Sequence, residues 1–346
     1  MKKEDMNDLK SSVSFVIIFL LLFAGFSFFV NNMIIATCGD GTFDGQCSVR
    51  KPYFCAEGKL VENSSRCGCP ADFSASGESC FSLYMKEPKT ISLNYIIRGE
   101  NKSINFTTYR GMAEYLSEIP REISYDNGEE VSRTDFEIRK INDEQQREFL
   151  LPLVIHIQNS ASDKTEQMRI AVSIVQKIPY GNSDKKANFF GAALAYSRYP
   201  YETLYDNMGV CEEKTELLAF ILRELGYGVV LFYHPFENHQ SLGIKCPAPY
   251  DYRDTGYCFV ETTGGSIISD TEIEYTEVGK LLSEPEAMFI SEGNSLGFNL
   301  YEYKDAEEMI KIRRAMEKTG KLSFFRHRKL EKLRVKYGLE EIYNAP

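Results

Sequence analysis

Six of the nine cysteines lie within one stretch of 43 residues, and this stretch restricts the fold more than any other feature of the sequence. It is rich in Gly, Ser and Asp and has little hydrophobic periodicity, so it cannot bury enough apolar surface to be stable without cross-links. Zinc ribbons pair their ligands as C-x2-C, whereas the only close pair here is separated by a single residue. We therefore predict a module at 37–82 held by disulfides rather than zinc. Three disulfides are expected, in a pairing that the spacing leaves open, among Cys38, Cys47, Cys55, Cys67, Cys69 and Cys80.

An apolar run near the N-terminus favours a location outside the cytoplasm for most of the chain. Residues 11–39 contain no charge, and 13–30 are 18 residues of almost unbroken apolar character. This is close to the roughly 20 that a membrane-spanning helix needs. Lysines precede the run, so the positive-inside tendency places 1–12 in the cytoplasm and the part after a 13–36 anchor outside. A cleaved signal peptide is the alternative, but no small-x-small cleavage site follows the run. We expect an uncleaved single-pass anchor in the cell membrane.

The charge of the chain limits its partners. A formal net charge of -10 argues against nucleic-acid binding, which usually needs a basic face. The C-terminal region 301–346 departs from this balance, because 304–336 hold 12 Lys/Arg against 5 Asp/Glu. A solvated amphipathic helix is the simplest interpretation of this basic region, and a contact with anionic lipid or an acidic partner is the alternative.

Hydrophobic periodicity predicts an α+β protein. Residues 83–140 are expected to form a strand-rich accessory segment, with strands over 84–108, a short helix near 112–120 and a further strand and turn at 128–139. Residues 141–300 are expected to form the main domain. Its expected elements are a helix at 142–159 with a kink or restart at Pro152, a helix at 162–178, a loop with aromatic anchors at 196–208, a helix at 211–225, and strands at 228–234, 240–246 and 257–263.

One cysteine is left without a partner in the main domain. Cys246 and Cys258 flank a turn-like segment and are placed to close a loop between neighbouring strands, which leaves Cys211 at the start of a helix. A helix N-terminus carries partial positive charge and free N–H groups, which favour a thiolate and offer a site for an oxyanion. Glu212 and Glu213 oppose thiolate formation, so a histidine partner is needed.

Of the four histidines, His239 is the best placed to pair with this thiol. It opens a strand after a short loop, whereas His234 ends the preceding strand before Pro235. The other two lie in predicted helices, His327 in the basic C-terminal region and His156 in a leucine-rich stretch.

Glu261 ends the next strand and is the acid expected to orient the imidazole, with Thr262 and Thr263 supporting it by hydrogen bonds. Taken alone, a cysteine is most often an inert buried hydrophobe, a loop histidine is most often structural, and a glutamate at a strand end is usually solvated. Cys211, His239 and Glu261 occur in this order on successive elements, and the order favours a catalytic set.

Several motifs together resemble the transglutaminase-like superfamily of papain-like cysteine enzymes. "GVCEEKTELLAFILRELGYGVVLF" is similar to its cysteine motif, "ENHQSLGIKC" to its histidine motif and "GYCFVETT" to its acid motif. "AVSIVQKIPY" and "YPYETL" resemble segments that precede the cysteine in prokaryotic members, and "YRGMAEYLSEIPREISY" resembles a segment of membrane-anchored archaeal members. The likeness covers about 162–270. It implies a papain-like core within 141–300, with the cysteine helix packed on an antiparallel sheet that bears the histidine and the acid.

By this resemblance Cys211 is the nucleophile, His239 the general base and Glu261 the orienting acid, with no cofactor or metal. The chain departs from the family pattern in having Glu where Asp is usual, in having Gln240 after the histidine, and in lacking a tryptophan on the oxyanion side. Gln176 is a substitute oxyanion donor by analogy with papain-type sites, while capping its own helix is the structural alternative.

The resemblance implies an enzyme that attacks amide bonds of a peptide or protein through a thioester. Completion by water makes it a peptidase or amidase, which the prokaryotic relatives favour, and completion by an amine makes it a protein-crosslinking transglutaminase. A non-catalytic binding or scaffold module that keeps the fold is the alternative, and the intact set of Cys, His and acid argues against it.

Overall fold

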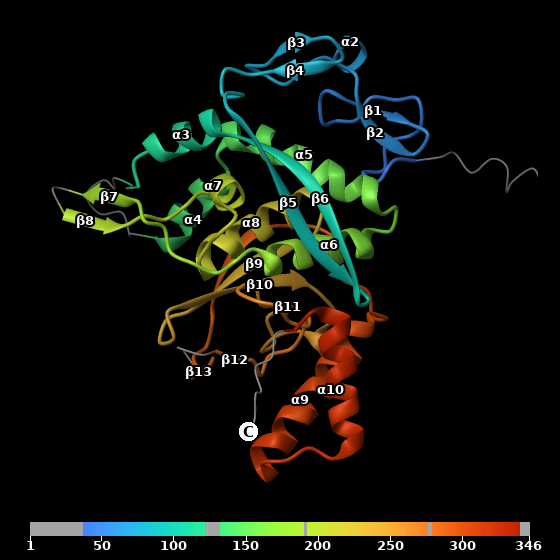
Figure 1. Cartoon of the computed structure of the whole chain (residues 1–346), viewed down its shortest axis with the longest axis vertical. Coiled ribbons are helices and arrows are strands. Elements are labelled where there is room, and N and C mark those ends of the chain that lie inside the picture. Colours follow the sequence, from blue (N-terminus) through green and yellow to red (C-terminus); the bar gives the residue numbers. More distant parts are fainter. Residues whose placement is uncertain (1–36, 122, 124–131, 190–191, 276–278, 340–346) are drawn as a thin grey trace, which may run out of the picture.

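The computed structural model describes residues 37–121, 123, 132–189, 192–275 and 279–339, which form a mixed α+β molecule (Figure 1). Within these ranges, no helix has both the length and the apolar character required to cross a membrane. The predicted cytoplasmic segment 1–12 and the 13–36 anchor lie outside the described residues.

The N-terminal module contains the three predicted disulfides. They join Cys38 to Cys55, Cys47 to Cys67 and Cys69 to Cys80. Their scaffold is two small hairpins and one helical turn, namely β1 (Tyr53–Ala56), β2 (Lys59–Glu62), α2 (Ser64–Cys67), β3 (Ser74–Ser76) and β4 (Ser79–Phe81). Apart from Tyr53 and Leu60, the buried apolar contacts of this module are the Cys38–Cys55 disulfide and Ile155 of the main domain. Cross-linking therefore replaces most of a core, as the composition predicts.

A long antiparallel hairpin follows, made of β5 (Pro88–Ile97) and β6 (Glu100–Tyr109). Alternate residues of both strands are buried, and β5 packs against the helix α6 (Lys164–Lys177). The hairpin leads into α3 (Arg110–Glu118), close to the predicted short helix.

The strand predicted at 128–139 is wrong where the structure describes it, because α4 (Arg133–Ile141) is a helix. Its buried residues are Glu137, Lys140 and Ile141, which share one face at helical spacing. This face is charged rather than apolar, so hydrophobic periodicity could not reveal it. In the described part of 83–140, strands β5 and β6 are therefore followed by two helices, α3 and α4.

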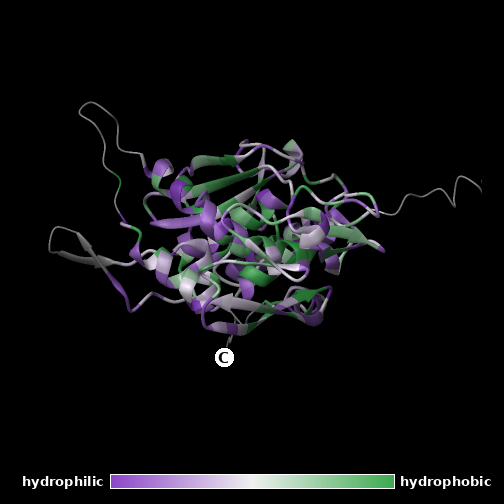
Figure 2. Cartoon of the chain, turned by 90° about the horizontal axis from the view of Figure 1, so that it is seen from above, coloured by the Kyte–Doolittle hydropathy of each residue, from purple (hydrophilic) through white to green (hydrophobic). Residues whose placement is uncertain are grey.

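The main domain packs helices on a four-stranded antiparallel sheet. The order of the strands is β11 (Tyr257–Val260), β10 (His239–Lys245), β9 (Val229–His234) and β14 (Glu286–Ser291). Helix α8 (Cys211–Glu224) lies against β10 and β9, and α5 (Glu144–Ser160) and α6 pack on α8. Pro152 lies inside α5, which continues through it rather than restarting. Seen from above, apolar segments gather in the middle of the molecule between these layers (Figure 2).

Two further differences from the sequence-based expectation concern short elements. The loop expected at 196–208 contains a helix, α7 (Pro200–Asp206), which starts with a proline at its first position and with Glu202 accepting from the Tyr199 N–H. Strand β14 was not predicted because only Met288 among its six residues is fully buried. The remaining short elements are β7 (Lys186–Phe189), β8 (Ala192–Ala195), η1 (Ala248–Tyr250), β12 (Glu274–Tyr275) and β13 (Gly279–Lys280).

The basic C-terminal region is a pair of helices rather than one. Helices α9 (Tyr301–Thr319) and α10 (Phe324–Tyr337) form a hairpin with its own small apolar core around Met309, Ile312 and Leu330. Gly320 ends α9 with a φ of 66°, a left-handed conformation that favours glycine. Figure 1 shows the hairpin (red) projecting from the end of the molecule opposite the cysteine-rich module.

A substitution at Gly243 tests the side-chain packing of the sheet. A Cβ on Gly243 of β10 would lie 2.6 Å from both Phe232 Cε2 and Val230 Cγ2. We expect Gly243→Ala to lower the free energy of unfolding by about 1–3 kcal/mol, because buried neighbours must move. Thermal or urea unfolding measures this. Gly297→Ala is the control, since nothing lies within 4 Å of its Cβ position, and equal stabilities of the two variants would contradict the packing described.

Candidate active site

Cys211 is the first residue of α8, and it is the free thiol of the chain. The other eight cysteines pair in four disulfides, including Cys246 with Cys258 as predicted. Cys211 is half-buried. The start of α8 is held by the Glu213 side chain, which accepts from the Val210 N–H at 3.0 Å. The thiol therefore lies at a well-defined helix N-terminus.

The histidine and the acid approach one another at the ends of adjacent strands. His239 opens β10, Glu261 follows β11, and His239 Nε2 lies 3.0 Å from Glu261 Oε2. The Cys211 side chain raises the pKa of His239 through hydrogen bonding and charge, so the sulfur lies beside the ring. Since Nε2 is engaged with Glu261, Nδ1 is the ring nitrogen left for the sulfur. The structure thus brings the three predicted residues together.

These contacts shift the pKa of both charged partners. Burial lowers the pKa of His239, but hydrogen bonds to Cys211 and Glu261 and the charge of Glu261 outweigh it and raise the pKa to about 10. Burial raises the pKa of Glu261, but the hydrogen bond and charge of His239, with further donors, lower it to about 2. At neutral pH the pair is an imidazolium next to a carboxylate.

Glu261 is held by five hydrogen bonds, of which that to His239 is one. Its Oε1 accepts from the N–H groups of Thr262 and Thr263 at 2.8 and 2.7 Å and from the Thr263 hydroxyl at 2.7 Å. Its Oε2 accepts from the hydroxyl of Tyr275. The two threonines are where the sequence predicts them, whereas Tyr275 was missed because nothing in its local pattern marks it. With every lone-pair direction occupied, the buried carboxylate has one orientation.

Tyr275 also supports the imidazole. Its ring centroid lies 4.5 Å from that of His239. Burial and the charge of Glu261 raise the pKa of Tyr275 well above its ordinary value, so its hydroxyl remains a donor. Tyr275 therefore restrains both Glu261 and His239.

The two acids that follow Cys211 have their charges compensated by buried cations. Glu212 lies 2.8 Å from the Nζ of Lys140 and 3.0 Å from Arg133. Glu213 lies 2.8 Å from Arg198 Nη1 and also accepts from the Arg198 N–H at 2.7 Å. The opposition to a thiolate that the sequence predicts from these acids is thereby largely cancelled.

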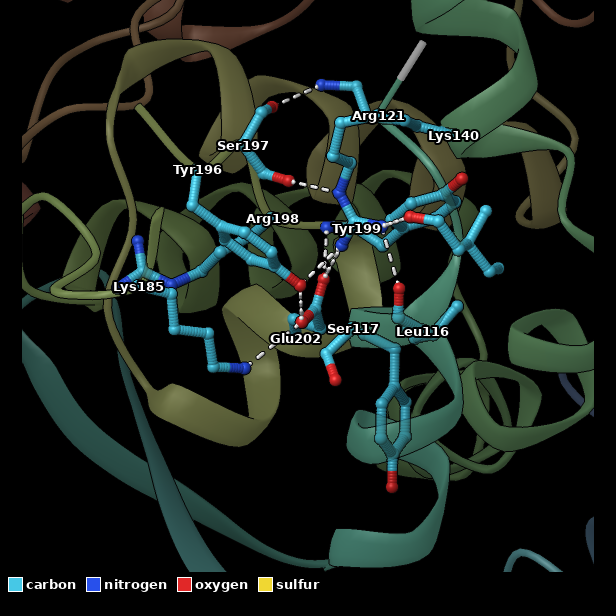
Figure 3. A network of polar contacts seen from close by, with 12 residues as sticks. Leu116, Ser117, Arg121, Lys140, Lys185, Tyr196, Ser197, Arg198, Tyr199 and Glu202 are labelled. Carbon is cyan, nitrogen blue, oxygen red and sulfur yellow. Dashed lines mark hydrogen bonds and ion pairs between the residues drawn. The ribbon is translucent and has the colours of Figure 1, made fainter. Parts of the chain in front are cut away.

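A second polar network fixes the segment that carries Arg198 (Figure 3). Glu202 accepts from the Tyr196 hydroxyl at 2.5 Å and pairs with Arg121 at 2.7 Å. The Arg121 guanidinium lies 4.5 Å from the ring centroids of Tyr196 and Tyr199. These contacts position 196–202 against the first turn of α8.

Three carboxylates near the site have the spacing of metal ligands. Oxygens of Glu137, Glu212 and Glu216 lie within 4.8 Å of one another. The Lys140 ammonium lies among them, 2.8 Å from Glu212 and 2.5 Å from Glu216. Burial and the charge of Glu137 raise the pKa of Glu216 well above its ordinary value. We therefore interpret the cluster as a carboxylate site filled by a lysine cation.

Gln176 is engaged with other groups, and the other three histidines have different surroundings. Gln176 Nε2 donates to the Glu261 carbonyl at 2.9 Å and to Ser266 Oγ at 3.0 Å. Its amide hydrogens hold the end of β11, and the oxyanion role expected for it stays a prediction. His234 bonds through Nδ1 to a backbone carbonyl, His156 packs edge-on against Phe106, and His327 is exposed on α10.

Comparison with known proteins adds only a distant likeness. No protein-family model and no curated protein matches the chain. Among solved structures, LapG of Legionella pneumophila matches with a TM-score of 0.26 and 14% identity, over 47% of this chain and 91% of LapG. Its calcium-bound form matches with a TM-score of 0.26 and 15% identity, over 50% and 98%. Similarity at this level does not establish a shared fold, and we argue function from the site itself.

The ion pair between His239 and Glu261 makes stability depend on pH. The pKa of His239 is raised from 6.5 to about 10, so its contribution is complete below about pH 6.5 and is lost as pH rises towards 10. The pKa of Glu261 is lowered from 4.5 to about 2, so its contribution is complete above about pH 4.5 and is lost as pH falls towards 2. We expect His239→Gln to remove part of the fall in unfolding free energy between pH 7 and 10, measured in urea.

His234→Gln serves as the control for this measurement. Burial lowers the pKa of His234, so its contribution does not change above pH 7. Wild type and His239→Gln curves that run parallel from pH 7 to 10 would contradict the raised pKa of His239.

The buried lysine provides a second stability test. Lys140→Met leaves Glu212 and Glu216 close together without their cation, and we expect a loss of about 3–5 kcal/mol in unfolding free energy. Adding Glu216→Gln should recover part of this loss because it removes a carboxylate. Lys329→Met is the control, since its pair with Glu308 is surface-exposed and should contribute at most about 1 kcal/mol. Similar losses in Lys140→Met and Lys329→Met would refute the role of Lys140.

Proposed function

We propose that this protein is a thiol enzyme that cleaves amide bonds in a peptide or protein substrate, with Cys211 as nucleophile, His239 as general base and acid, and Glu261 as the acid that orients the imidazole. One observation carries the proposal: the free thiol at the start of α8 lies beside a buried histidine whose pKa it raises, and this histidine is itself paired with a buried carboxylate at 3.0 Å. This order of groups activates a sulfur nucleophile. The apolar run at 13–30 supports placing the enzyme on the outer side of the cell membrane, held by a single-pass anchor.

The reaction begins with the proton of Cys211 on His239, which leaves a thiolate next to an imidazolium. The sulfur, as thiolate, attacks the carbonyl carbon, and the oxyanion is met by backbone N–H groups in the first turn of α8. The His239 imidazolium then gives its proton to the leaving amine as the C–N bond breaks, which leaves a thioester on Cys211. His239, now neutral, takes a proton from water as the water attacks the thioester. The carboxylic acid departs and the thiol is restored.

Glu261 acts by orientation and charge. Its bond to Nε2 turns Nδ1 towards the sulfur, and its negative charge stabilises the imidazolium that accompanies the thiolate. Its side chain is one methylene longer than the aspartate usual in the resembling family. The bonds from Thr262, Thr263 and Tyr275 hold this longer side chain in place.

The chemistry of the thiol gives the most direct test. We expect iodoacetamide to label Cys211 rapidly below pH 7, because the imidazolium stabilises the thiolate, and His239→Asn to reduce this labelling about 100-fold or more. Mass spectrometry under non-reducing conditions measures it, with Cys211→Ala as the unlabelled control. Slow labelling that increases only above pH 8, as for an ordinary thiol, would favour a non-catalytic scaffold.

The acceptor that reacts with the thioester distinguishes a peptidase, which uses water, from a transglutaminase, which uses an amine. With a peptide library, new N-termini formed by the wild type and absent with Cys211→Ala indicate a peptidase. Incorporation of a fluorescent primary amine into glutamine-containing peptides indicates a transglutaminase. Activity should fall about 10²–10⁴-fold in His239→Asn.

A further inference from the structure

The free end of the α9–α10 hairpin carries an apolar and basic surface that the proposed catalysis does not use. We define the tip patch as Lys318, Lys321, Phe324, Phe325, Arg326 and Arg328. All six residues are exposed, and the opposite end of α10 is packed on the body of the molecule, where a Cβ on Gly338 would lie 2.1 Å from Ile96. Figure 1 shows the turn between α9 and α10 as the part of the hairpin farthest from the sheet.

The two phenylalanines are unusually exposed for neighbouring aromatic residues. Phe324 is 74% exposed and Phe325 is 77% exposed. Their rings contact each other at 5.8 Å. The small core of the hairpin is built from other residues, including Met309 and Leu330, so the phenylalanines are not needed to hold α9 and α10 together. Adjacent apolar side chains that are exposed to water at a protruding tip are typical of a surface that binds a protein or a membrane.

The positive charge of the tip patch is not compensated within the described part of the chain. Its four cations make no ion pair with a described residue, whereas every acid between 304 and 336 is paired elsewhere. The pairs are Asp305 with Lys336, Glu307 with Lys311, Glu308 with Lys329, Glu317 with Lys280 and Glu331 with Arg334. On a chain with a formal net charge of -10, this is a local positive field around an apolar centre.

We propose that the tip patch docks on a membrane surface containing anionic lipid, with Phe324 and Phe325 inserted between headgroups and the surrounding cations bound to lipid phosphates or carboxylates. Because the tip patch and the cysteine-rich module that follows residue 36 lie at opposite ends of the molecule (Figure 1), this surface belongs to a membrane other than the one that holds the 13–36 anchor. Aromatic side chains beside lysine and arginine are the composition of interfacial membrane-binding segments. An acidic protein would be recognised by the cations alone and would leave the exposed rings unexplained. The proposal is independent of the chemistry at Cys211.

The absence of tryptophan from the chain permits a clean experiment. Phe324→Trp places a single tryptophan in the tip patch of the full chain, which is reconstituted into phosphatidylcholine nanodiscs and then mixed with liposomes. With liposomes that contain phosphatidylserine we expect a blue-shifted emission that is quenched by brominated acyl chains in the liposomes, and with pure phosphatidylcholine liposomes a much smaller effect. Adding Arg326→Glu and Arg328→Glu should abolish the difference between the two lipids, as should high salt, which screens the cations.

Phe298→Trp is the matched control. Phe298 is 66% exposed and precedes α9, so it lies about 30 Å from the tip patch by helix length. Equal emission and quenching of the two tryptophans with anionic liposomes would overturn the proposal. A blue shift of Phe324→Trp caused by soluble polyglutamate, without quenching by brominated lipid, would also overturn it and indicate an acidic protein partner. Thermal unfolding checks that each variant is folded.

Discussion

The contact between His239 and Glu261 is the interaction on which the candidate site depends. A carboxylate with an exposed fraction of only 2% is unfavourable unless its oxygens are fully hydrogen-bonded and its charge is paired. Here the backbone after β11, Thr263 and Tyr275 supply the hydrogen bonds, and the imidazolium supplies the charge. The same arrangement fixes the ring so that its other nitrogen is available to Cys211. The same hydrogen bonds therefore make the burial of Glu261 possible and orient His239 towards Cys211.

The charged residues in the first turn of α8 are likewise paired with opposite charges. A thiol followed by two glutamates would be a poor thiolate in isolation, yet Lys140 and Arg198 bring cations to Glu212 and Glu213 from other segments of the chain. Lys140 lies on α4, and Arg198 lies in the segment anchored by the Arg121–Glu202 pair. The accessory helices therefore contribute to the electrostatics of the site as well as to the core.

Disulfides and apolar packing contribute differently to the stability of the different parts of the molecule. The N-terminal module has few buried apolar residues and relies on its three disulfides, whereas the main domain has a continuous apolar core with one disulfide at its edge. The C-terminal hairpin lies between these extremes, with a small core near the body and a tip that is apolar and basic. Because the core of the hairpin lies near the body, the tip can contact a partner without disturbing the fold.

Local patterns in the sequence determined the helix that begins at Cys211, the strands that carry His239 and Glu261, the crowded cysteines and the odd thiol. These features depend on periodicity, counting and short-range chemistry, which neighbouring residues specify. The charged face of α4, the helix α7, the edge strand β14, the pairing of the disulfides, and the contacts of Tyr275, Lys140 and Gln176 were decided by the tertiary structure. Each of them joins residues far apart in the chain, or buries a polar side chain whose partner lies on another element. Such a partner leaves no trace in the local sequence, because it exists only once the elements are packed.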